Sequence, residues 1–383
     1  MLAYITRRLV YGLVTLLALS VIVFSLLQMT GGGPLDRLKL NPRMGPYIQT
    51  LTELWGLDQP AWRQYLTWLK NYTTIQEFSF QNVLPVLAVV TAIGATVVLI
   101  KFIQRRWRGL AIVGIWATAL YIAISNTTIK FNWGTSFSGS GDVWDLVWSR
   151  AGATFRLGFT ALFLALIIGV PLGIYQAVRQ YSFFDQLGTI GAFVAFSTPI
   201  FVIGIGLQIV LALYLEKWTG VKLFYVTGMN DPSYPTMSAM GKFVDTLQHL
   251  MLPAVSIALI SLAGYARFQR SSMLDVLHSD YLRTAKAKGL PRRKVIIKHA
   301  LRNAMIPIVT LVSLDLAFMI GGAIITESIF GWPGIGRLYI KAITEIDYPV
   351  VMAVVMVIGL GLIIMNIVAD ILYGVLDPRV RYD

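Results

Sequence analysis

The chain of 383 residues contains no cysteine, only three histidines, and only 13% charged residues. The absence of cysteine excludes disulfides, thiol catalysis and thiolate metal sites. The three histidines are scattered, which argues against a metal site built on them. Soluble domains carry about 25% charged residues, so half of the usual solvating charge is missing. With a mean hydropathy of +0.68, the chain is expected to be a membrane protein and not a soluble globular one.

A phosphate-binding loop is also missing. Nothing in the sequence matches G-x-x-x-x-G-K-[ST], and the pair Gly241-Lys242 is followed by Phe243. Without such a loop we expect that this chain does not hydrolyse ATP itself.

Long apolar runs are abundant. Eight stretches are long enough to cross about 30 Å of hydrocarbon as helices, and Asp315 is the only charge within them. The first run follows Arg7 and Arg8, but it is longer than the apolar part of a secretory signal and lacks a cleavage pattern. We therefore expect an all-α, polytopic membrane bundle of about eight spans. The runs are 9–27, 83–100, 109–125, 157–178, 186–215, 250–266, 303–326 and 348–369.

The excess of basic residues is concentrated in the loops on one side of the expected spans. The net charge is +13, and eight spans divide the loops into two sets. The loops on the side of the termini hold 19 Lys and Arg against six acidic residues, whereas the longer opposite loops hold 13 against twelve. The positive-inside rule then predicts that both termini are cytoplasmic. The charge is thus a topological signal, and we expect no nucleic-acid partner.

The external stretch 28–82 contains an aromatic amphipathic segment. Trp62, Tyr65, Leu66 and Leu69 follow Pro60 and recur with helical spacing. Two interpretations stay open here: a helix lying at the outer membrane interface, or a small external cap packed on the bundle.

The loop 267–302 is the longest cytoplasmic segment and carries ten of the basic residues. Asp280 is suited to cap a first helix, Gly289 to end it, and Pro291 to begin a second helix. Ile297 and Leu301 would share one face of that second helix. The pattern favours a rigid knob for docking to a partner, and the alternative is a polybasic loop held at anionic membrane lipid.

The same loop resembles a known motif. Arg283-Thr284-Ala285, then Gly289, then His299-Ala300-Leu301 is similar to the EAA loop of binding-protein-dependent ABC importer permeases, in the dipeptide/oligopeptide/nickel branch. The first two positions depart from the general pattern, which has Glu and Ala there. The resemblance is closest to the first permease subunit of that branch. It continues in 55–60, 249–254, 321–323, 327–336, 347–349 and 376–379.

The resemblance implies a function and a set of partners. The chain would form half of a translocation path for peptides in a prokaryotic plasma (inner) membrane; nickel or oligosaccharide cargo is the alternative within the family. It would pair with a second permease, two cytoplasmic ATPases that bind ATP and magnesium, and an extracytoplasmic substrate-binding protein, and would hold no cofactor itself. External loops 28–82 and 216–249 would receive that binding protein. The residues expected to couple to the ATPases are Asp280, Arg283, Thr284, Ala285, Gly289, Pro291, Ile297, His299 and Leu301.

The chain departs from the usual six spans of such permeases at about 75–130. We expect the runs 83–100 and 109–125 to form an inserted hairpin, between a first region 1–74 and a permease core 131–383.

Polar residues within spans are costly in lipid and are candidates for the translocation path. Gln208, Asp315 and Asn366 are the candidates here, and structural pairing is the alternative for Asp315. Asp370, near the end of the last span, is expected to pair with a neighbouring helix. Another class of function stays open: a proton-coupled secondary transporter that uses Asp315 as the carrier.

Overall fold

The computed structural model describes residues 2–30, 33–39, 45–80, 91, 127–139 and 141–376. The chain divides into two compact units, Met1–Asp36 with Asp145–Asp383, and Arg37–Trp144. The expected hairpin runs 83–100 and 109–125 lie outside the described residues, apart from position 91.

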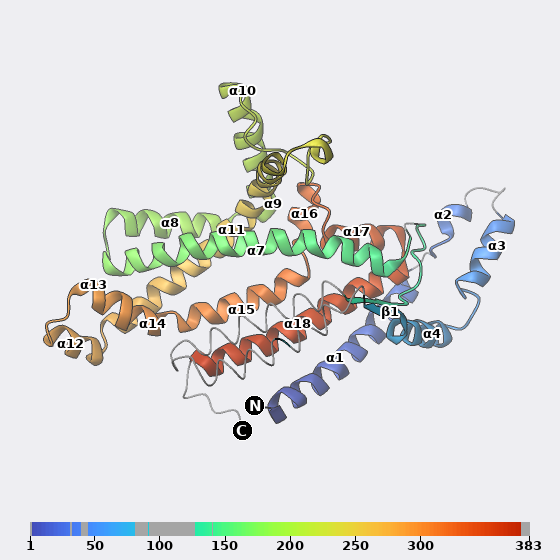
Figure 1. The fold of residues 1–383 in the computed structure, drawn as a ribbon, viewed down its shortest axis with the longest axis horizontal. Helices are drawn as coiled ribbons and strands as arrows, with labels where there is room; N and C mark the ends of the chain where they lie inside the picture. The colour runs from blue at the N-terminus through green and yellow to red at the C-terminus, as the bar shows by residue number, and fades with distance from the viewer. Residues whose placement is uncertain are drawn as a thin grey trace. The chain divides into compact units, whose positions relative to one another are not determined.

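The larger unit is helical (Figure 1). It contains α1 (Leu2–Met29), α7 (Val143–Val178), α8 (Phe183–Ser197), α9 (Ile200–Leu207), α10 (Leu215–Thr219), α11 (Ala239–Leu277), α12 (Asp280–Ala287), α13 (Arg292–Lys294), α14 (Leu301–Ala304), α15 (Ile306–Ile320), α16 (Ile324–Ile329), α17 (Ile335–Glu345) and α18 (Tyr348–Leu376), with π-helical η2 (Gln208–Tyr214) and η4 (Val295–Ala300) and the 3-10 turn η3 (Tyr234–Thr236).

Five helices in the described part of the chain are long and apolar enough to cross a membrane: Thr6–Met29, Val143–Val178, Ile200–Thr219, Ala239–Leu277 and Tyr348–Val368. Two further apolar helices, Phe183–Ser197 and Ile306–Leu316, are shorter. These helices confirm the polytopic helical bundle.

Three boundaries differ from the sequence expectation. The run 303–326 is divided, because α15 ends at Ile320 and α16 begins at Ile324 after a turn in which Gly322 has φ +76°. The run 186–215 is divided at Pro199, which has no N–H to continue α8 and precedes α9. The basic loop was expected to begin at Arg267, but α11 continues as one helix to Leu277. At 39 residues, α11 is about 58 Å long, so it extends well beyond the hydrocarbon as a continuous rod.

The helices pack through small residues, as is common in membranes. A Cβ atom on Gly173 of α7 would lie 2.4 Å from the carbonyl oxygen of Ala266 on α11, so α7 and α11 approach backbone to backbone. α8 also packs on α11, α15 packs on α18, and α1 packs on α18. Arg8 and Asp370 join α1 to α18 through an ion pair of 2.9 Å, which confirms the pairing expected for Asp370.

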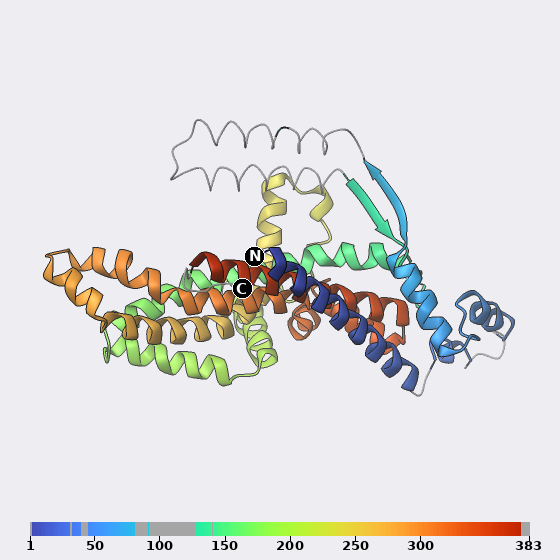
Figure 2. The same cartoon turned by 90° about the horizontal axis from the view of Figure 1, so that it is seen from below.

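The smaller unit contains α2 (Asp36–Lys39) at its boundary, α3 (Gly45–Leu54), α4 (Ala61–Thr73), β1 (Ile75–Phe80) and β2 (Thr127–Phe131). β1 and β2 pair antiparallel (Figure 2), and they are the only strands in the described part of the chain. The helix expected after Pro60 is present as α4. Its Tyr72 ring stacks on Trp133 with centroids 4.9 Å apart, and Trp133 meets Trp144 at 4.6 Å. This aromatic packing joins the end of α4 to the segment that follows β2 within the smaller unit.

Candidate functional site

A cavity of about 250 Å³ lies among helices of the larger unit. α7, α11 and α15 each contribute to its wall, together with the turn that follows α15. The described lining is mostly apolar, with two neutral polar side chains, Thr154 and Ser261, and one charged side chain, Asp315. The lining residues are Thr154, Leu157, Gly158, Ala161, Leu162, Ile257, Ser261, Asp315, Met319, Gly322 and Ala323.

Asp315 on α15 is the charged residue of this wall. Its carboxylate accepts a hydrogen bond from the hydroxyl of Tyr265 on α11. Tyr265 itself is almost fully buried, so the bond joins two spans inside the bundle. Asp315 is therefore paired to a neighbouring helix, as the structural alternative expected, and it also lines a cavity.

One side of the cavity meets a buried network around Glu327 in α16. The Glu327 side chain is 0% exposed. The hydroxyl of Thr154, a cavity residue, donates to Glu327 Oε1 at 2.9 Å, and the backbone N–H of Arg337 donates to Oε2 at 2.9 Å. Thr154 in turn accepts a hydrogen bond of 2.8 Å from the N–H of Ile335. These bonds fasten the α16–α17 turn to α7.

Two further features hold this turn. The indole N–H of Trp332 donates to the carbonyl oxygen of Ala153 on α7 at 2.9 Å, and the Trp332 ring is completely buried. A Cβ atom on Gly334 would lie 2.3 Å from the Glu327 carboxyl group, so only glycine leaves room for that carboxylate. The stretch 327–336 was identified from the sequence only as a motif. In the structure it is a compact segment, here called the plug, that is hydrogen-bonded to α7 beside the cavity.

The other two predicted path residues lie elsewhere. The amide of Gln208 is buried and donates to the carbonyl oxygens of Val226 and Ile329, at 2.8 and 3.3 Å. It therefore holds an external loop and α16 together and does not line the cavity. Asn366 is exposed on α18. The structure does not bring Gln208, Asp315 and Asn366 to one site.

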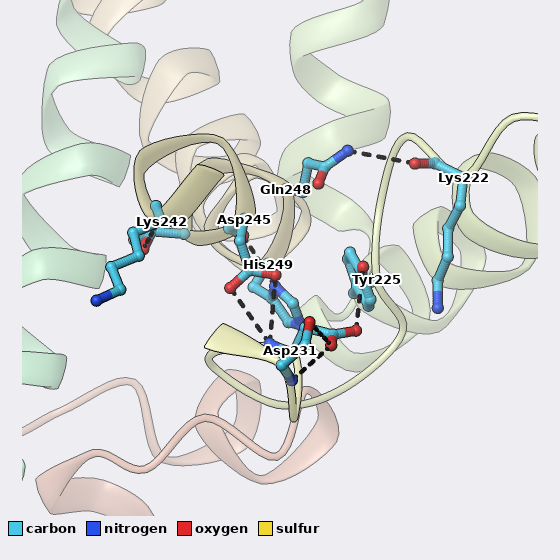
Figure 3. Close-up of polar contacts among 9 residues, drawn as sticks. Lys222, Tyr225, Asp231, Lys242, Asp245, Gln248 and His249 are labelled. Carbon is cyan, nitrogen blue, oxygen red and sulfur yellow. Dashed lines mark hydrogen bonds and ion pairs between the residues drawn. The ribbon is translucent and has the colours of Figure 1, made fainter. Parts of the chain in front are cut away.

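The external loop before α11 is anchored by a second polar cluster (Figure 3). The ring of His249 is buried and stacks on Tyr225 with centroids 3.8 Å apart. Its Nδ1 lies 2.8 Å from the carbonyl oxygen of Asp245 and 3.2 Å from Asp245 Oδ1, so Nδ1 carries the proton. The Asp245 carboxylate also accepts the backbone N–H of Asp231 at 3.2 Å. These contacts fix the loop to the start of α11.

Hydrogen bonds also set the charge of this loop. The backbone N–H and hydroxyl of Ser233 donate to Asp231 and hold the pKa of its carboxyl below the ordinary value. The hydroxyl of Tyr225 donates to the same carboxylate at 3.3 Å, and burial raises the pKa of Tyr225. Asp231 therefore stays ionised and Tyr225 stays neutral near pH 7.

The basic loop forms a compact knob, residues 280–302, at the end of α11. Leu282, Ala285, Val295 and Ala300 are buried together with Ala177 and Met273, so the knob packs directly on the ends of α7 and α11. Gly289 has φ +73° and forms the left-handed turn expected after α12. The second helix differs from a regular α-helix, because η4 is a π-helical segment between α13 and α14. Asp280 lies in the first turn of α12 and not at its cap.

The predicted coupling residues separate into a buried and an exposed set. Ala285 is buried, whereas the Arg283 side chain is 81% exposed and Ile297 is 53% exposed. The Arg283–Asp280 pair is 3.9 Å long and solvent-exposed, so it contributes little to stability. An apolar side chain and a basic one thus face outward from a packed base. Thr284 and Pro291 are exposed, and His299 and Leu301 are half-buried.

Sequence reasoning missed the residues that act through distant partners. Tyr265 and Thr154 showed no local signal, since their partners lie 50 and 173 positions away. Glu327 was visible as an acidic residue in the recognised 327–336 stretch, directly after the apolar run that contains Asp315. His249 began another recognised stretch, 249–254, and its position directly before the apolar run 250–266 was the available signal.

Comparisons with known proteins agree with this architecture. Residues 169–382 match the family described as "Binding-protein-dependent transport system inner membrane component". The chain is 33% identical over 400 residues to the dipeptide transport system permease protein DppB of Escherichia coli (strain K12), covering 100% of this chain and 99% of that protein. It is 30% identical over 384 residues to the oligopeptide transport system permease protein AppB of Bacillus subtilis (strain 168), covering 100% of both. The chain belongs to the family of binding-protein-dependent transport system inner membrane components, the membrane permeases of ABC importers.

Proposed function

We propose that this permease imports peptides, most directly dipeptides or oligopeptides, and forms half of their path through a prokaryotic plasma (inner) membrane. The observation that carries the proposal is the similarity of the entire chain, end to end, to permeases named for dipeptide and oligopeptide transport. The cavity with Asp315 supplies a place for such cargo within the spans.

The energy for import comes from two separate ATPase subunits that bind ATP and magnesium, since this chain lacks a phosphate-binding loop. The knob 280–302 docks on one of them through its exposed Arg283 and Ile297. Its buried base supports this role, because a movement of the ATPase must pass through a stiff connection to reach the spans. The packing on α7 and α11 provides that connection. The continuous helix α11 runs from the knob to Tyr265, the partner of Asp315.

A second, homologous permease completes the path, and an extracytoplasmic binding protein delivers the peptide to loops 28–82 and 216–249. The anchoring of the second loop by His249 and Asp245 suits a docking surface, because a preformed surface costs less to bind than a mobile one. The charge bias of the loops supports a cytoplasmic position for both termini and for the knob.

Residues 75–130 form an inserted hairpin between a first region, 1–74, and the permease core, 131–383. The pairing of β1 with β2 supports this proposal, because it brings the two ends of the segment side by side. A packing or lipid-facing role suits such an insert better than a direct part in transport.

The docking role is tested with Arg283→Ala and Gly289→Ala in the complete complex. Arg283→Ala removes an exposed basic contact, and Gly289→Ala strains the turn by about 1 kcal/mol, although open space surrounds the position. We expect both to lower co-purification of the ATPases and substrate-dependent ATP turnover. Gly191→Ala, a helical position with open space, is the matched control. Unchanged assembly and turnover in both variants would contradict the docking role.

A further inference from the structure

The Asp315 carboxylate is incompletely satisfied. It accepts one hydrogen bond, from Tyr265, and within the described part of the chain it has no ion pair and no second hydrogen-bond donor. An ionised carboxylate can accept about four hydrogen bonds. The unused sites adjoin the cavity, since Asp315 is one of its lining residues.

A carboxylate in this position would be stabilised by a positively charged ligand. Removing a charged group from water is costly unless it is paired, and ionisable groups inside a membrane protein usually have a partner or a functional role. A neutral hydroxyl donor, such as that of Tyr265, compensates only part of this cost. A ligand that carries an ammonium group would supply the missing charge and up to three donors.

The size of the cavity limits the ligand. An apolar cavity of about 150 Å³ accommodates benzene with its six carbon atoms. At the same volume per non-hydrogen atom, the cavity of about 250 Å³ accommodates a ligand of about ten non-hydrogen atoms. Alanyl-alanine is close to this size. A longer peptide would present only its first residues here.

The remaining lining residues are mostly apolar and can contact peptide side chains of different kinds. Leu157, Leu162, Ile257 and Met319 offer apolar surface without directional partners. The Thr154 hydroxyl is already used, because it donates to Glu327 and accepts from Ile335. Ser261 adds one neutral hydroxyl, and Asp315 is the one charged residue among the described lining residues. The charge of Asp315 is therefore the strongest contact that this wall offers, and the apolar part does not select a particular side chain.

We propose that Asp315 binds the protonated α-amino group of the peptide as it passes through the membrane, with Tyr265 holding the carboxylate in place. The proposal rests on the proposed function of peptide import and names the group by which the permease recognises its cargo. The amino group is common to all unmodified peptides, so this contact accepts them whatever their side chains.

The chain has no cysteine, so an introduced thiol is the only one in this chain, and the labelling of this chain, read after the subunits are separated, reports on the cavity. Ser261→Cys places that thiol on the α11 wall. In the complete complex we would compare its labelling by a cationic aminoethyl methanethiosulfonate and by a neutral methyl methanethiosulfonate, each normalised to its rate with a free thiol. We expect Asp315 to favour the cationic reagent about tenfold, the effect of roughly 1.4 kcal/mol. Asp315→Asn should remove this preference and Asp315→Glu should keep it. Equal normalised rates with Asp315 present would overturn the proposal.

A second measurement leaves Asp315 unchanged and therefore does not depend on how Asp315→Asn folds. Alanyl-alanine and its N-acetyl derivative, at millimolar concentration, would be tested for protection of the same thiol. We expect at least fivefold slower labelling with the free amine and no slowing with the acetylated peptide. Equal protection by both would overturn the role of the amino group while leaving peptide passage in place. Protection by neither would contradict peptide import itself, and the proposal with it.

Discussion

The guanidinium of Arg270 donates two hydrogen bonds to the carboxylate of Asp185, from Nε to Oδ1 at 2.8 Å and from an Nη atom to Oδ2 at 2.9 Å. Asp185 lies in the first turn of α8, and Arg270 lies on α11. The carboxylate is almost fully buried and also accepts the backbone N–H of Tyr181 at 2.8 Å. The pair therefore ties α8 to the part of α11 that leads to the knob.

Breaking this pair is expected to destabilise the permease. Asp185→Asn or Arg270→Gln leaves one member of a mostly buried pair without its partner, which costs about 3 kcal/mol. The melting temperature of the purified permease should fall in either variant, and the double variant should be less than additive. The longer pair Lys341–Glu345, 3.9 Å apart with a Lys341 side chain that is 58% exposed, is the control, and Lys341→Ala should have little effect. Equal effects of the two pairs would contradict this account.

The same pair predicts a dependence of stability on pH. The Arg270 hydrogen bonds are the main reason why the pKa of Asp185 lies below its ordinary value of 3.8. The stabilisation is therefore complete above pH 3.8 and is lost as the pH falls through the lower pKa of the folded protein. The difference in melting temperature between the wild type and Asp185→Asn should be constant from pH 8 to about 5 and shrink below about 4. A difference that disappears above pH 5 would show that another group is responsible.

The Glu327 network should control the plug at 327–336. Thr154→Val removes the hydroxyl that joins Glu327 to Ile335, and we expect a loss of about 2 kcal/mol together with an increase in ATP turnover without peptide. Gly334→Ala should be at least as damaging, because its Cβ atom would overlap the carboxylate. Gly206→Ala, with nothing within 4 Å of the added atom, is the matched control. Thermal stability and basal ATPase activity of the complex check both expectations.

The contribution of His249 can be separated into its ring stacking and its hydrogen bond. His249→Phe keeps an aromatic ring against Tyr225 but loses the donor at Nδ1, which removes the hydrogen bond to the Asp245 carbonyl oxygen and the contact with Asp245 Oδ1. We expect a loss of about 1 to 2 kcal/mol and faster proteolysis in the loop 220–233. Gln248→Ala removes an exposed hydrogen bond to Lys222 and should leave proteolysis unchanged. If a protease cleaves the His249→Phe protein no faster than the wild type, His249 does not anchor the loop.

Local patterns predicted much of this fold. The apolar runs 9–27, 157–178, 250–266 and 348–369 predicted long helices. Gly289 with Pro291 predicted the corner of the knob, because helix length and turn conformation depend on adjacent residues. The π-helical segment η4 and the continuation of α11 to Leu277 were not predicted, since both are stabilised by packing on other helices. The bonds of Tyr265 with Asp315 and of Thr154 with Glu327 join distant parts of the chain, and no local pattern contains them.

The central claim is that this chain is the membrane part of a peptide importer driven by separate ATPases. The most direct measurement is the uptake of a radiolabelled dipeptide into proteoliposomes that contain this permease, its partner permease and both ATPases. We predict uptake against a gradient that requires ATP and the binding protein and persists when a proton ionophore is added. Uptake without ATP that collapses with the ionophore would contradict the claim and would instead show a proton-coupled transporter.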